Sequence, residues 1–78
     1  MPTVFQDGPY TFRFYSADSV EPPHINIHRD RDSVKFWLDP VRMARNWGFA
    51  AHKLRRIHRL VEVRQTEFLE AWYDYFGT

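Results

Sequence analysis

The sequence predicts an α+β fold in which a small antiparallel sheet of three to four strands, formed by the N-terminal half, is covered on one face by a short and a long C-terminal helix. Two patterns support this class. Residues 10–15, 24–28 and 33–38 alternate apolar and polar side chains, as strands with one buried face do. Residues 50–76 instead carry apolar side chains at three- and four-residue intervals, which is typical of an amphipathic helix. The length of 78 residues predicts a single domain, residues 1–78, and the absence of cysteine excludes disulfides.

The expected strands occupy the first half of the chain, residues 1–38. A short strand at Val4 and Phe5 ends at the turn Asp7-Gly8-Pro9. The other expected strands are residues 10–15, 24–28 and 33–38. The Pro22-Pro23 pair forces extended backbone just before the third of these strands. Short turns join most of these segments, so antiparallel pairing is expected.

The expected helices occupy the second half of the chain. Asp39 is a preferred N-cap residue, Pro40 suits the first helical position, and Gly48 is typical of a helix end. These signals predict a short helix over residues 39–48. A long helix is predicted over residues 50–76. Its apolar stripe, which would cover the sheet, consists of Leu54, Ile57, Val61, Phe68, Trp72 and Tyr75.

Alternation also predicts a polar outer face of the sheet. The side chains expected there are Thr11, Arg13, Tyr15, His24, Asn26, His28, Lys35 and Trp37. Cations that bind phosphate, mixed with aromatic rings that stack on bases, are typical of sheets that bind single-stranded RNA. The same residue types are also common on ordinary solvated strand faces. The sequence leaves both interpretations open, and Arg13, Lys35 and Trp37 are the binding candidates.

The long predicted helix has an unusual distribution of charge. Residues 41–64 contain seven arginines and lysines against one acid, whereas residues 65–78 contain three acids and no base. Bases in the first half and acids in the second oppose the helix dipole. This pattern is either ordinary variation on a solvated face or the mark of an anion-binding surface for nucleic-acid phosphate. The binding candidates on this helix are Lys53, Arg55, Arg56 and Arg59.

No catalytic residue is assigned from the sequence, which favours a protein that is not an enzyme. In one alternative, His24 and His28 act as general base and acid of a metal-independent RNase, with Arg13 or Lys35 stabilising developing charge. No metal site is expected, because His24 and His28 lie roughly 13 Å apart along an extended strand. No cofactor is expected either, because the chain lacks a phosphate-cradling glycine loop.

Several motifs along the chain match the pattern of one family. They are the N-terminal MPTVF, then EPPH, KFWLDPV and the C-terminal EAWYDYFG. Together they resemble domain-of-unknown-function family 4160, which consists of small bacterial proteins. The resemblance implies a toxin–antitoxin-like or mobile-element gene context and brings no established activity. The family's His-x-His is replaced here by His24-Ile25-Asn26, and Ala50 and Lys53 replace its serine N-cap and following acid.

Taken together, these patterns predict a non-enzymatic binding module of a bacterial or phage accessory system. The expected partner is RNA or a nucleic-acid-handling protein. A second alternative, besides the RNase, is a protein-only inhibitor or antitoxin, including a phage inhibitor of a host defence complex. Tyr73 or Phe76 is expected to support a homodimer. No membrane contact is expected, and the N-terminus lacks the features of a signal peptide, so we expect a cytoplasmic location.

Overall fold

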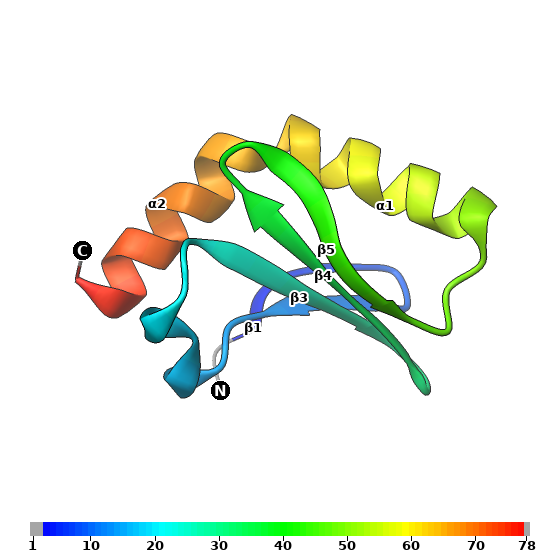
Figure 1. The fold of residues 1–78 in the computed structure, drawn as a ribbon, viewed down its shortest axis with the longest axis horizontal. Coiled ribbons are helices and arrows are strands. Elements are labelled where there is room, and N and C mark those ends of the chain that lie inside the picture. The colour runs from blue at the N-terminus through cyan, green and yellow to red at the C-terminus, as the bar shows by residue number, and fades with distance from the viewer. Residues whose placement is uncertain (1–2, 78) are drawn as a thin grey trace.

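The computed structural model describes residues 3–77, in which one antiparallel sheet is followed by two helices (Figure 1). Its elements are β1 (Thr3–Asp7), β2 (Tyr10–Arg13), the 3-10 helix η1 (Ser16–Val20), β3 (His24–Arg29), β4 (Asp32–Leu38), β5 (Val41–Trp47), α1 (Ala51–Val63) and α2 (Gln65–Phe76). The five strands lie in the order β1-β2-β3-β4-β5, and each pairs antiparallel with its neighbour in sequence. The predicted α+β class, with an antiparallel sheet and C-terminal helices, is confirmed.

The core lies between one face of the sheet and the two helices, which run one after the other along that face in Figure 1. Alternate residues of β2, β3 and β4 face the helices because the side chains of a strand alternate. Aromatic pairs join α2 to β2 and to the residue that follows it: the ring centres of Phe12 and Phe68 are 5.6 Å apart, and those of Phe14, just after β2, and Trp72 are 5.3 Å apart. The core residues are Tyr10, Phe12, Phe14, Ile25, Ile27, Val34, Phe36, Leu38, Phe49, Ile57, Val61, Phe68 and Trp72.

The predicted short helix over residues 39–48 is wrong, because this segment forms β5. Asp39 and Pro40, joined by a cis peptide bond, occupy the turn after β4 instead of starting a helix. Val41–Trp47 then pairs with β4, so the sheet has five strands where three to four were expected. The ladder shifts register between Lys35 and Phe36, which leaves Ala44 as the extra residue of a bulge. This strand completes the sheet at its β4 edge, so two strands instead of one lie beyond β3.

Gly48 ends β5 and redirects the chain toward α1. Its φ is +103°, in the left-handed region that favours glycine, and the side chain of Asp32 occupies the place where a Cβ would lie. Asn46 secures the same connection with two hydrogen bonds: its Oδ1 accepts from the Phe49 amide at 3.1 Å, and its Nδ2 donates to the Phe49 carbonyl at 3.0 Å. The glycine therefore marks the end of a strand, not of a helix.

The predicted long helix over residues 50–76 is interrupted at Arg64, so it forms α1 and α2 as separate helices. Arg64 has φ −104° and ψ 16°, outside helical values. Its guanidinium carbon lies 4.0 Å from the centre of the Phe5 ring. Next to it, Nε2 of Gln65 donates a hydrogen bond to the carbonyl of Leu38 at 2.7 Å. These contacts with the sheet fix the change of direction at residue 64.

Candidate nucleic-acid interface

The second face of the sheet lies opposite the helices (Figure 1). It carries cations and aromatic rings. Cross-strand partners point to the same side of a sheet, so the register defines rows of neighbours on this open face. The rows are Thr11–His28–Ser33–Trp47, Arg13–Asn26–Lys35–Arg45 and His24–Trp37–Arg42. The candidates Arg13, Lys35 and Trp37 therefore share one surface. Arg42, Arg45 and Trp47 join them from β5, and sequence reasoning missed these three because it assigned their segment to a helix.

Cations and rings of the open face contact one another directly. Nζ of Lys35 lies 4.6 Å from the Trp37 ring centre and 2.5 Å from a carboxylate oxygen of Glu21. The guanidinium carbon of Arg45 lies 5.1 Å from the centre of the Trp47 ring. Within residues 3–77, neither Arg13 nor Arg45 forms a salt bridge, and Nε of Arg13 is buried without a hydrogen-bond partner. The open face consequently carries positive charge that no salt bridge among the described residues neutralises.

His24 was expected on the solvated outer face, but it is only 1% exposed. The cause is tertiary: α2 and η1 close over the start of β3, and the His24 ring lies 5.1 Å from the Trp72 ring and 5.6 Å from the Trp37 ring. Its Nδ1 is 2.9 Å from the Pro22 carbonyl, and its Nε2 is 3.2 Å from Oδ2 of Asp18. His24 is therefore a packed structural residue that a substrate cannot reach.

Asp18 fixes η1 against the sheet. Its Oδ2 accepts hydrogen bonds from the Tyr15 amide and from Nδ2 of Asn26, both at 2.9 Å, in addition to its contact with His24. Three groups from two segments thus converge on one carboxylate oxygen. Because Tyr15 directly precedes η1, this junction also determines where the Tyr15 ring lies.

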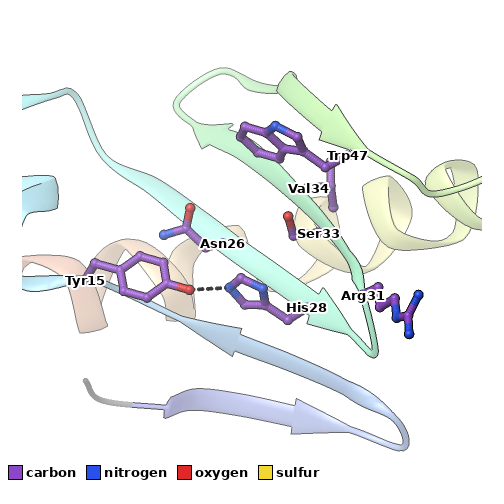
Figure 2. Close-up of a pocket in the computed structure, with 7 residues that line it drawn as sticks. All are labelled: Tyr15, Asn26, His28, Arg31, Ser33, Val34 and Trp47. Carbon is purple, nitrogen blue, oxygen red and sulfur yellow. Dashed lines mark hydrogen bonds between the residues drawn. The ribbon is translucent and has the colours of Figure 1, made fainter.

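The Tyr15 ring borders a hollow on the open face, which is drawn in Figure 2. The hollow has a volume of about 400 Å³ and is lined by Tyr15, Asn26, His28, Arg31, Ser33, Val34 and Trp47. The hydroxyl of Tyr15 and Nε2 of His28 are hydrogen bonded at 2.5 Å. Burial, and to a smaller extent the positive charge of Arg13, lowers the pKa of His28 below 6.5. The imidazole in the hollow is accordingly neutral at physiological pH.

The lowered pKa of His28 makes stability depend on pH. In the unfolded chain His28 titrates at its ordinary value of 6.5, whereas the folded protein resists protonation. The contribution of His28 is therefore fully present above pH 6.5 and is lost as the pH falls from 6.5 through the lowered pKa of the folded protein, because the unfolded state binds more protons in this range. We expect the free energy of unfolding, measured by urea denaturation from pH 7.5 to 5.5, to fall less steeply in His28→Asn than in the native protein. His52→Asn, at an exposed position of α1, is the control that should keep the native slope. Equal slopes in all three proteins would contradict this role.

The basic binding candidates that were predicted on one long helix lie on α1, on the helix-covered side of the sheet. Arg55, Arg56 and Arg59 are exposed there and Lys53 is half-buried. The sheet separates them from Arg13, Lys35 and Trp37, so the two candidate sets do not form one site (Figure 1). The helix break also changes the dipole argument, since Glu67 now lies in the first turn of α2, where an acid is favourable.

The remaining predictions concern metals, membranes and self-association. In the described part of the chain, no cluster of three or more histidine, cysteine or acidic side chains has the geometry of a metal site. Among residues 3–77, no helix has the length and apolar character needed to cross a membrane. Of the two residues expected at a dimer interface, Phe76 packs on Trp72 with ring centres 4.3 Å apart, whereas Tyr73 is 49% exposed. Dimerisation stays a prediction.

The fold and this face define a class: small α+β proteins in which two helices cover one side of an antiparallel sheet and a cationic, aromatic side stays open. A family model, Domain of unknown function (DUF4160), matches residues 10–73. The chain belongs to this family. No curated protein and no solved structure gives a significant match. The family's description assigns no activity.

Proposed function

We propose that the protein is a non-enzymatic binding module that docks single-stranded RNA on the open sheet face. The observation that carries this proposal is the composition of that face, which combines cations with aromatic rings. The cations are Arg13, Arg31, Lys35, Arg42 and Arg45, and the rings are those of Tyr15, His28, Trp37 and Trp47. Binding to single strands combines a positive surface for the backbone with flat side chains on which bases stack.

The electrostatic part of this proposal rests on cations of the open face that form no salt bridge within residues 3–77. Two acids beside the face are already engaged: Asp18 with Tyr15, Asn26 and His24, and Glu21 with Lys35. Arg45 has its guanidinium on an aromatic ring instead of a carboxylate. A phosphate near Arg13 or Arg45 therefore meets a cation without first breaking an ion pair, which lowers the cost of binding.

The burial of His24 favours binding over catalysis. The alternative RNase requires two accessible histidines, and His24 is enclosed by Trp37, Trp72 and Asp18. His28 alone remains accessible at the hollow. We further propose that the module works within a toxin–antitoxin-like or other accessory system of a bacterium or phage, as its family resemblance implies. Co-purification of a stoichiometric protein partner without nucleic acid would favour the protein-only alternative instead.

Charge reversal on the two layers tests which one binds RNA. The double variant Arg42→Glu, Arg45→Glu changes two exposed residues of β5, and Arg55→Glu, Arg59→Glu changes two exposed residues of α1. We expect the β5 pair to weaken binding of a labelled 10-nucleotide RNA by roughly tenfold to hundredfold and to reduce its salt dependence, because two phosphate contacts are lost. The measurement is fluorescence anisotropy at several salt concentrations, with circular dichroism to verify folding.

The α1 pair is the matched control, and it should change affinity by no more than about threefold, since it alters only long-range attraction. A native protein that binds the RNA at no salt concentration would refute the proposed function. Loss of binding in the α1 double variant alone would indicate that RNA binds to the helix and not to the sheet.

A further inference from the structure

We propose that the hollow between Trp47 and the Tyr15–His28 pair receives one unpaired base of the bound RNA strand. This inference rests on the proposed function and goes further, because it names the part of the ligand that the hollow takes. A surface of cations alone binds the backbone of any strand. A recess lined by rings and polar groups recognises a base that has left the stack.

The hollow exists because a small residue lies between two large ones. His28, Ser33 and Trp47 are cross-strand neighbours in one row on β3, β4 and β5. Two strand spacings separate the outer members of this row by about 10 Å. A flat ring needs contacts of about 3.5 Å on each face, so the space above Ser33 suits the thickness of one base. In Figure 2, Ser33 lies between the Trp47 indole and the Tyr15–His28 pair.

Polar groups in the hollow have capacity left for the edge of a base. Nδ2 of Asn26 donates to the Arg13 carbonyl at 3.3 Å and to Asp18 at 2.9 Å, so both of its protons are used within the protein. This arrangement fixes the orientation of the amide and leaves its Oδ1 as an acceptor in the lining of the hollow. The hydroxyl of Ser33 adds a group that both donates and accepts. Every nucleobase offers an N–H donor at its edge, which matches the Asn26 oxygen.

Cations flank the hollow in both directions along the strands. Arg31, in the turn between β3 and β4, lines one end. Arg13 and Arg45 belong to the neighbouring row, two residues along the strands or roughly 7 Å away. A nucleotide in the hollow thus has positive charge near the phosphates on both sides of its base. A strand supplies both phosphates, so we assign the base to RNA and not to a free nucleotide.

Filling the hollow while keeping every charge tests this assignment. Ser33→Leu places an apolar side chain where the base would lie, on a half-exposed strand position that tolerates it. Thr11→Leu adds a similar side chain on the far side of His28 in the same row and is the matched control. The ligands are a 10-nucleotide RNA, an abasic strand of the same length and charge, and adenosine monophosphate. Binding is measured by fluorescence anisotropy and competition.

We expect Ser33→Leu to weaken binding of the intact RNA by roughly tenfold, the loss typical of one stacked base, and to leave binding of the abasic strand unchanged. Thr11→Leu should bind both strands as the native protein does. Trp47→Leu, at a position 46% exposed, removes one wall without disturbing the core and should repeat the selective loss.

Native affinity for intact RNA in both Ser33→Leu and Trp47→Leu would overturn the base site while the proposed function stands. Adenosine monophosphate that binds as tightly as the RNA would overturn its assignment to a strand. Failure of the native protein to bind either strand would refute the proposed function itself.

Discussion

Replacing Trp72 by alanine is expected to lower the free energy of unfolding by about 3–5 kcal/mol, the usual cost of removing a large buried ring. Trp72 is 3% exposed, and its ring centre lies 5.3 Å from that of Phe14, 5.1 Å from that of His24 and 4.3 Å from that of Phe76. It thus joins α2 to β3, to the segment that follows β2 and to the end of its own helix. Domains of this size have only a few kcal/mol of stability, so we expect much of the variant to be unfolded at 25 °C.

Tyr73→Ala is the matched control for this prediction. Tyr73 is the next residue on the same helix and is 49% exposed, so its removal should cost no more than about 1 kcal/mol. Urea denaturation followed by circular dichroism at 222 nm measures both variants. A Trp72→Ala protein as stable as Tyr73→Ala would mean that α2 is not needed to hold the sheet.

Replacing Asp18 by alanine is expected to cost about 2–4 kcal/mol, because buried polar groups would lose a shared acceptor. Those groups are the Tyr15 amide, Nδ2 of Asn26 and Nε2 of His24. The change also releases η1 from β3, so the Tyr15 ring no longer has a fixed place beside the hollow. Amide hydrogen exchange of Tyr15 should accelerate together with the loss of stability seen in urea denaturation.

Glu62→Ala serves as the control for Asp18→Ala. Glu62 is an acid on α1 with a 60% exposed side chain, and its contact with His58 is 3.7 Å long. An exposed pair of this kind contributes at most about 1 kcal/mol. If the Tyr15 amide stayed protected in Asp18→Ala, the position of η1 would have to depend on other contacts.

The inward faces of β2, β3 and β4 could be predicted because most of the burial there follows a period of two. Phe12 and Phe14 face the helices, as do Ile25 and Ile27, while Arg13 and Asn26 pair with each other on the open face. Burial alternates along β2, from Ile25 to His28 and from Ser33 to Leu38, so the inward face of these segments can be deduced from the sequence alone. The same period predicted that Arg13, Lys35 and Trp37 would share the outer face of the sheet.

β5 could not be predicted because the bulge breaks this period. Val41 and Met43 pair with inward-facing residues of β4, whereas Arg45 and Trp47, at the same odd-numbered spacing, pair with outward-facing ones. The change of face at Ala44 removes the alternation and leaves apolar residues at intervals that also suit a helix. Asp39-Pro40 reinforced that interpretation, because the same pair suits a turn and a helix start.

The environment of His24 was missed for a different reason. Its position in the alternation is outward, and the sequence of β3 contains no sign that other elements cover this end of the sheet. Trp72 and Asp18, which enclose it, are 48 and 6 residues away along the chain. Burial produced by distant packing overrides a local pattern. Asn26 and His28 on the same strand are not enclosed in this way and remain on the open face.

The strands lie in the sheet in the same order as in the sequence, and this order has a consequence for the kinetics of folding. Each strand pairs with the strand before it in sequence, so the sheet assembles from contacts that close short loops. Little chain entropy is lost before such contacts form, which favours rapid assembly. The contacts of Phe12 with Phe68 and of Phe14 with Trp72 instead join residues more than fifty positions apart. We therefore expect docking of α2 on the sheet to be the slow, non-local step of folding.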